Sequence, residues 1–143
     1  MFNITLNDVN EAPGFDQPSY TFSLPENSAN GTAVGTVSAT DVDAGDSLGY
    51  AILGDTGGVF AINPSSGAIT VANTTALDFE TTPTFNLQVQ VTDTGLLTDT
   101  VSLTIDLSNV NEPPTQAFIG DRSVSAGNLL TFIVSATDPD VLT

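Results

Sequence analysis

The sequence of 143 residues contains no cysteine, no histidine and no tryptophan, and its one basic residue is Arg122. Without cysteine no disulfide holds the fold, so stability has to come from a hydrophobic core or from bound metal ions. Zinc, copper and iron–sulfur sites lack their usual histidine and cysteine ligands. A serine or threonine nucleophile lacks a histidine to activate it. We therefore expect that the protein is not an enzyme.

Charge of one sign dominates the chain. It carries 17 aspartate and glutamate residues, which gives a formal net charge of −16. Nucleic acid and anionic membranes repel such a surface, so neither is expected as a partner, whereas cations are attracted. No apolar run reaches the roughly 18 residues of a membrane-spanning helix, so direct membrane insertion is not expected. Hydrophobic residues make up 40% of the chain, which favours a folded core over disorder.

Internal similarity divides the chain. The stretch "ITLNDVNEAP" (4–13) returns as "IDLSNVNEPP" (105–114), and "VSATDVD" (37–43) returns as "VSATDPD" (134–140). Recurrence at a spacing of about a hundred residues indicates an array of repeats. We predict that residues 1–13 are the last strand and linker of a preceding repeat. Residues 14–113 then form one complete repeat with its exit linker, and 114–143 form the first strands of a following, truncated repeat.

Apolar residues alternate with polar ones, as in half-buried strands. Phe85, Leu87, Val89 and Val91 share one face of their segment, and Val101, Leu103, Ile105 and Leu107 share one face of theirs. Turn-forming clusters such as "NPSSG" (63–67) separate the segments. The pattern predicts an all-β fold, a seven-stranded immunoglobulin-like Greek-key sandwich with antiparallel pairing. The expected strands are 19–24, 33–40, 48–53, 59–62, 68–71, 84–93 and 100–107.

Many acidic residues gather in turns and at strand ends. The two aspartates of "DVD" (41–43) are alternate residues, which share one face of an extended segment but lie roughly 6.5–7 Å apart along it, so their carboxylates converge only where a turn or an ion draws them together. Calcium takes six to eight oxygen ligands from carboxylates, amides and carbonyls, which is the set available here. A solvated turn explains "DVD" alone equally well. The remaining aspartates, which we expect to be solvated or turn residues, are Asp8, Asp46, Asp55, Asp99, Asp106 and Asp121.

Several short motifs occur together and in a fixed order. They are "PEN" (25–27), "ATDVD" (39–43), "FAINPSSGAITV" (60–71), "LDFE" (77–80), "VQVTD" (89–93) and the linkers "DVNEAP" (8–13) and "NVNEPP" (109–114). With these motifs the sequence resembles a cadherin repeat, in the divergent form found in large bacterial surface and secreted proteins. The resemblance implies calcium ions in each linker between successive repeats. It therefore also implies an extracellular or cell-surface location.

The resemblance implies a ligand set for each linker. In the first linker, Asn10 and Glu11 would combine with Asp41, Asp43 and Asp93 of the repeat. The set of the second linker would be Glu26, Asp78 and Glu80 of the repeat, Asn111 and Glu112 of the linker, and Asp138 and Asp140 of the following repeat. Glu11 and Glu112 stand where many cadherins have aspartate, and the linker is one residue shorter, which leaves the number of ions open.

The implied function is that of a calcium-binding repeat that rigidifies a multidomain extracellular protein and supports cell adhesion. Its partners would be the neighbouring repeats of the same chain, joined through the linkers, with homophilic contacts or cell-surface glycans as further candidates. A carbohydrate-binding or other ligand-binding β-sandwich module of a secreted protein stays open as the alternative, because such sites lie in variable loops that the fold readily hosts.

Overall fold

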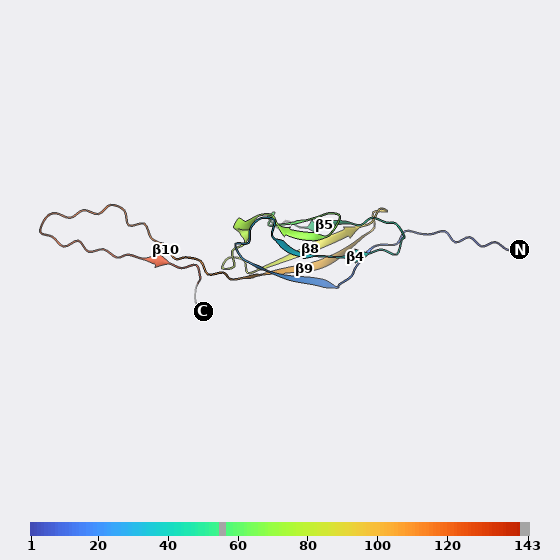
Figure 1. Ribbon diagram of the computed structural model, residues 1–143, viewed down its shortest axis with the longest axis horizontal. Helices are drawn as coiled ribbons and strands as arrows, with labels where there is room; N and C mark the ends of the chain where they lie inside the picture. Colours follow the sequence, from blue (N-terminus) through green and yellow to red (C-terminus); the bar gives the residue numbers. More distant parts are fainter. Residues whose placement is uncertain (55–56, 141–143) are drawn as a thin grey trace.

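The computed structural model describes residues 1–54 and 57–140, which form a β-sandwich with an extended segment at each end (Figure 1). Asp55 and residues 141–143 lie outside the described residues. A single turn of 3₁₀-helix, η1 (Thr74–Ala76), is the one helix among the described residues. The strands are β1 (Gly14–Phe15), β2 (Ser19–Pro25), β3 (Ala33–Thr36), β4 (Ala39–Thr40), β5 (Gly49–Leu53), β6 (Phe60–Ile62), β7 (Ala68–Val71), β8 (Thr84–Thr92), β9 (Thr98–Ser108), β10 (Thr115–Gln116) and β11 (Ala136–Thr137).

Two sheets make the sandwich, one with the strand order β2-β9-β8-β5 and one with the order β3-β7-β6. The predicted seven-stranded immunoglobulin-like sandwich is confirmed. The prediction of purely antiparallel pairing is wrong at one edge, because β2 runs parallel to β9, from Ser19 opposite Ser102 to Pro25 opposite Ser108. The alternation of polar and apolar residues indicates which face of a strand is buried, but it does not indicate whether the neighbouring strand is parallel or antiparallel. Two parallel strands need a long connection between them, and here the chain forms β3 to β8 between the end of β2 and the start of β9.

The segment expected as one strand at 33–40 is divided in two. A bulge between Ala33 and Gly35 interrupts its pairing with β7, and the chain then leaves β3 and pairs as β4 with β1. Val37, between the two pieces, is completely buried. β4 ends at Thr40, so the turn that begins at Asp41 lies at the end of the sandwich rather than along its side. The division therefore positions one of the acidic motifs.

The hydrophobic core lies between the two sheets. The alternation predicted for β8 and β9 is confirmed, since Val89, Val91, Leu103 and Ile105 are at most 1% exposed. The rings of Phe60 and Phe85 meet edge to face, with their centroids 5.2 Å apart. Complete burial of a valine, leucine, isoleucine or phenylalanine side chain stabilises a fold by about 1.5–3 kcal/mol. The core is closed by apolar residues of the sandwich itself.

The chain enters and leaves the sandwich at opposite ends (Figure 1). Residues 1–10 are exposed and have no regular structure. After β9, residues 109–140 form a long loop that extends from the C-terminal end of the sandwich and returns to it (Figure 1). Within this loop β10 pairs with β11, with Thr115 opposite Thr137. Within the described residues there is no helix of the length and apolarity needed to span a membrane. The division into repeats at residues 13 and 113 stays a prediction.

Gly67 closes the turn between β6 and β7. Its φ is +68°, and a Cβ there would overlap the carbonyl oxygen of Val37. Gly31 also has a positive φ, +86°, which side-chain-bearing residues rarely adopt, but a Cβ built there has no atom within 4 Å. It therefore shares the backbone strain of Gly67 without the overlap. We expect Gly31→Ala to lower the free energy of unfolding by about 1–2 kcal/mol. Gly67→Ala should lower the free energy of unfolding by about 1–3 kcal/mol more, because the backbone at Val37 must shift.

Urea unfolding of the two variants beside the unmodified chain measures both values. Equal losses for Gly67→Ala and Gly31→Ala would contradict the close approach of the Gly67 turn to Val37.

Candidate functional site

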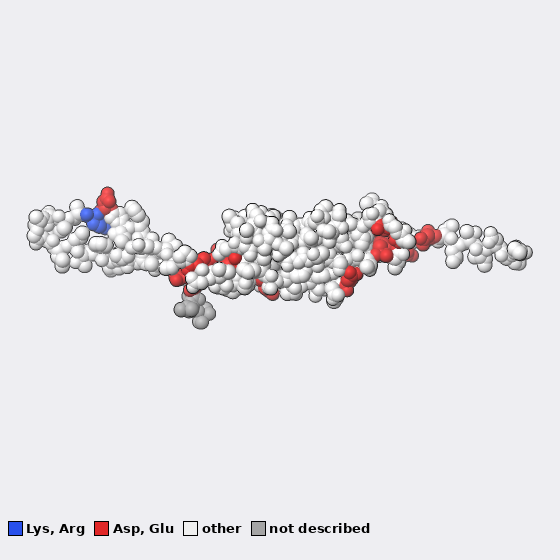
Figure 2. Space-filling view, viewed as in Figure 1, with Lys and Arg blue, Asp and Glu red and all other residues white. Residues whose placement is uncertain are grey.

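Carboxylates gather at the two ends of the sandwich (Figure 2). Three groups occur among the described residues, and in each of them one carboxylate oxygen per residue lies within 4.8 Å of the others. The C-terminal group lies where the chain leaves the sandwich and consists of Glu26, Glu80, Glu112 and Asp140. At the opposite end, the outer N-terminal group consists of Asp8, Glu11 and Asp43, and the inner N-terminal group of Asp41, Asp46 and Asp93.

Glu26 is the buried member of the C-terminal group, with 2% of its surface exposed. It directly follows β2, and its backbone N–H donates to Ser108 O at the end of β9 (3.0 Å). Its Oε1 accepts from the N–H of Val110 and its Oε2 from the N–H of Phe79, both at 2.7 Å. One carboxylate therefore joins the end of β2, the loop before β8 and the start of the exit linker.

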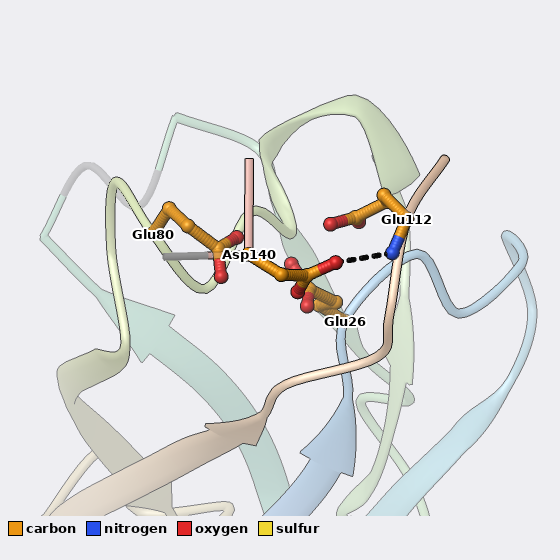
Figure 3. A group of neighbouring side chains, drawn as sticks. All are labelled: Glu26, Glu80, Glu112 and Asp140. Carbon is orange, nitrogen blue, oxygen red and sulfur yellow. Dashed lines mark hydrogen bonds between the residues drawn. The ribbon is translucent and has the colours of Figure 1, made fainter. Parts of the chain in front are cut away.

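Glu112 and Asp140 face Glu26 from the linker and from the segment beyond it (Figure 3). The N–H of Glu112 donates to Asp140 Oδ2. Glu80 completes the group and accepts from Asn109 Nδ2 (2.6 Å). Desolvation raises the pKa of Glu80, and the negative charges of Glu26, Glu112 and Asp140 raise it further. The raised pKa of Glu80 therefore reflects desolvation first and the crowding of like charges second.

Asp78, Asn111 and Asp138 were also predicted as ligands of the second linker, and they lie beside the C-terminal group rather than in it. Both oxygens of Asp78 accept from Thr81, one from its N–H and one from its hydroxyl, each at 2.9 Å. Asp78 nevertheless lines a depression of about 330 Å³ together with Glu80 and Glu112. Asn111 Nδ2 donates to Glu112 O (3.2 Å), and Asp138 Oδ1 accepts from the N–H of Asp140 (3.1 Å).

The N-terminal end repeats this arrangement. The N–H of Glu11 donates to Asp43 Oδ2 (2.8 Å), and the N–H of Asp43 donates to Asp41 Oδ1 (2.9 Å). Asn10 Nδ2 donates to Glu11 O (3.3 Å). The same three bonds at the other end join Glu112 with Asp140, Asp140 with Asp138, and Asn111 with Glu112. The two linkers thus approach their Asp-x-Asp turns in the same way.

Asp93 is the buried member of the inner N-terminal group, with 4% of its surface exposed. Its Oδ1 accepts from the N–H of Leu97 across the hairpin between β8 and β9, and its Oδ2 accepts from Asn10 Nδ2, both at 2.8 Å. A Cβ at Gly95 would lie 2.6 Å from the Asn10 side chain, so glycine lets the linker pack on this hairpin. Asp93 therefore lies in the hairpin between β8 and β9.

Asp8 and Asp46 were predicted to be solvated or turn residues, and Asp8 is exposed while Asp46 lies in the turn after Asp43. The prediction did not foresee that each also belongs to a carboxylate group. Desolvation is the largest cause that raises the pKa of Glu11, and the negative charges of Asp43 and Asp8 raise it further. The sequence held a signal for Asp46, which lies three residues after Asp43 and closes the same turn, its N–H donating to Asp43 O (3.3 Å).

Asp99 and Asp106 belong to none of these groups and accept hydrogen bonds from distant parts of the chain. Asp99 accepts from the N–H of Phe15 (3.1 Å) and Asp106 from the hydroxyl of Thr84 (2.9 Å). Asp121 is exposed, as predicted.

Four buried carboxylate oxygens have no hydrogen-bond partner within residues 1–54 and 57–140. They are Asp41 Oδ2, Asp46 Oδ2, Glu112 Oε2 and Asp140 Oδ1. Burying a polar atom without a partner is unfavourable, and more so for a charged one. All four belong to the groups described above, at both ends of the sandwich. Carboxylate oxygens without nitrogen or sulfur donors suit a hard cation such as Ca²⁺, so the residues present fit that ion.

The fold and these groups together define an immunoglobulin-like β-sandwich with carboxylate groups gathered at its two ends. Residues 20–108 match the family model described as "Cadherin domain", and the chain belongs to the cadherin family. The resemblance stated from the sequence motifs is confirmed. Cadherin domains as a family are adhesion domains rather than enzymes.

Curated relatives come from animals. Cadherin-87A of Drosophila melanogaster is 37% identical over 97% of this chain, which covers 7% of that protein. Human Cadherin-related family member 2 is 37% identical over 78% of this chain, which covers 9% of that protein. The chain therefore spans less than a tenth of either relative. The bacterial origin expected from the motifs stays a prediction.

Solved structures of cadherin ectodomains resemble the whole arrangement. The human Desmocollin-1 ectodomain has a TM-score of 0.67 and 33% identity, over 91% of this chain and 27% of that one. The EC22-24 fragment of mouse Cadherin-23 has a TM-score of 0.67 and 28% identity, over 89% of this chain and 44% of that one.

The contacts of Glu26 predict a structural role that is independent of any ion. Glu26→Ala removes the acceptor of two backbone N–H groups, so we expect the free energy of unfolding in chelator to fall by about 2 kcal/mol or more. Glu80→Ala, at an exposed residue bonded to one side chain, should change stability far less. Denaturant unfolding in chelator compares the two variants. A loss for Glu80→Ala as large as that for Glu26→Ala would refute this role.

Proposed function

We propose that the chain is a calcium-binding cadherin repeat of a larger extracellular protein, and that the carboxylate groups stiffen its junctions with neighbouring repeats. The observation that carries the proposal is the repetition, at both ends, of the same contacts between a linker Asn-Glu pair and an Asp-x-Asp turn. The unpartnered carboxylate oxygens belong to these groups, which supports a cation as their shared partner.

The proposed ligands come from separate parts of the chain at each junction. A bound Ca²⁺ supplies two positive charges and takes six to eight oxygens. Asn10, Glu11, Asp41, Asp43 and Asp93 serve the N-terminal junction. The ligands of the C-terminal junction are Glu26, Asp78, Glu80, Asn111, Glu112, Asp138 and Asp140.

The mechanism follows from repulsion between carboxylates. Two like charges about 4 Å apart repel by roughly 4 kcal/mol at the effective dielectric constant near a protein surface. The C-terminal group brings four carboxylates within 4.8 Å, from the end of β2, the loop before β8, the linker and the segment around Asp140. Without a cation this repulsion pushes the segments apart and the junction becomes a hinge. With a shared cation the same carboxylates hold the segments together, and the junction becomes a stiff connection.

The surroundings of the protein would control this change. Extracellular calcium modules commonly bind with dissociation constants of about 10⁻⁴–10⁻³ M, so extracellular calcium suffices and cytosolic calcium does not. In this proposal the neighbouring repeats of the same chain are the direct partners. The stiffened rod supports cell adhesion, with homophilic contacts or cell-surface glycans as its further partners. The motif set also leads us to propose a bacterial surface or secreted protein as the parent.

Calcium should stabilise the chain against unfolding. At about 10 mM Ca²⁺, a site with the affinity given above adds about 1.4–2.7 kcal/mol to the free energy of unfolding. We therefore expect the melting temperature of chelator-treated protein to rise with Ca²⁺, and to rise much less with Mg²⁺, which sheds its waters reluctantly. Calorimetric titration of the same sample counts the sites. The absence of binding and of any rise at millimolar Ca²⁺ would refute the proposal.

Stiffening is tested by a distance measurement. Because the chain has no cysteine, spin labels attach only at introduced ones. We expect the distance distribution between labels at Thr21→Cys on β2 and Ser123→Cys beyond the linker to narrow when Ca²⁺ is added. A second pair, Thr21→Cys with Ser65→Cys, lies within the sandwich and should not change. A distribution between positions 21 and 123 that is equally broad with and without bound Ca²⁺ would exclude stiffening.

A further inference from the structure

The inner N-terminal group contains an aspartate that neither the motifs nor the family resemblance assigned. We propose that Asp46 is an additional carboxylate ligand of the ion held by Asp41 and Asp93, an inference that rests on the proposed function. One oxygen from each of the three residues lies within 4.8 Å of the others. Three full negative charges would then surround one divalent cation.

Local contacts fix Asp46 in this position. Its N–H donates to Asp43 O (3.3 Å), which closes the turn after the Asp-x-Asp motif. Its Oδ1 accepts from the hydroxyl of Thr94, the residue after Asp93. The Asp46 side chain therefore joins the turn after β4 to the hairpin between β8 and β9, and it is held before any ion arrives.

The second oxygen of Asp46 carries the inference. Oδ2 is buried and has no hydrogen-bond partner in the described parts of the chain. Asp41 divides its oxygens in the same way, with Oδ1 accepting from the N–H of Asp43 and Oδ2 buried without a partner. An aspartate that served only as a turn residue would have its free oxygen in water. Here two residues with such an oxygen, Asp41 and Asp46, belong to one group with the buried Asp93.

An extra carboxylate changes the order in which sites fill. Calcium affinity depends on the number of charged ligands and on the rigidity of the site. The inner N-terminal site would have three carboxylates, one of them buried, on two turns that are already hydrogen-bonded to each other. It should therefore bind Ca²⁺ more tightly than the outer site, whose members Asp8 and Glu11 lie on the exposed linker.

The test compares Asp46→Asn with Asp106→Asn. Asp106 is a matched control, because it also accepts from a threonine hydroxyl (Thr84 Oγ1, 2.9 Å) but belongs to none of the carboxylate groups. In calorimetric titrations with Ca²⁺, Asp46→Asn should weaken the tightest site about tenfold or more and leave the other sites unchanged. Asp106→Asn should titrate like the unmodified chain. Equal titrations for both variants and the unmodified chain would overturn the role of Asp46.

A third variant separates the carboxylate from its hydrogen bond. Thr94→Val removes the hydroxyl donor and keeps the charge, so it should retain most of the affinity. An equal loss in Thr94→Val and Asp46→Asn would mean that Asp46 acts only by holding the turn.

A measurement on the unmodified chain does not depend on any variant folding. The carboxyl carbon resonance of Asp46 should shift on addition of Ca²⁺, whereas that of Asp106 should not. An Asp46 resonance that stays fixed while calorimetry records binding would overturn the inference and leave the proposed function standing. No binding at all would overturn both.

Discussion

Repulsion among carboxylates is the constraint on which both ends of this molecule depend. The chain has 17 acidic side chains and one basic one, so almost none of its negative charge is neutralised from within. Backbone N–H groups satisfy some of the oxygens, most fully at Glu26, where two amides hold a buried carboxylate. They do not remove the charge. Under the proposed function, a fold that crowds such groups at each end is stable as a sandwich, and a shared cation is what would define its junctions.

Alternation in the sequence was sufficient to predict the two layers, because burial on one face is a local property. It predicted that Val89, Val91, Leu103 and Ile105 face inward, and all four are buried. It could not predict the parallel pairing of β2 with β9, since partner and direction depend on contacts between residues more than eighty positions apart. The division of the segment 33–40 was also missed. Its cause is the bulge near Gly35 and a change of partner, neither of which alters the polar and apolar pattern.

The candidate sites were predictable where one short motif supplies the contact. The resemblance implied that the Asn-Glu linkers meet the Asp-x-Asp turns, and the linker N–H is bonded to the second aspartate of the turn at both ends. Asp46 was missed because it matches no motif, although it lies only three residues beyond Asp43. Asp78 shows that a motif match alone does not establish that a carboxylate is available to an ion. It matches a motif, yet Thr81 occupies both of its oxygens, so its availability to an ion depends on a local bond that no sequence pattern reports.

Under the proposed function, the separation between core and junctions would let such a repeat vary the stiffness of its junctions without losing its fold. The buried apolar residues close the sandwich by themselves, and the only buried charged side chains among the described residues, Glu26 and Asp93, lie at its two ends. Substitutions among the exposed members of a carboxylate group therefore change the charge around an ion more than they change the free energy of folding. The role inferred for the half-buried Asp46 would add one carboxylate to a junction through a turn that the backbone already forms. The stiffness of each junction then depends on a few linker and turn residues, whereas the shape of the repeat depends on the alternation of its strands.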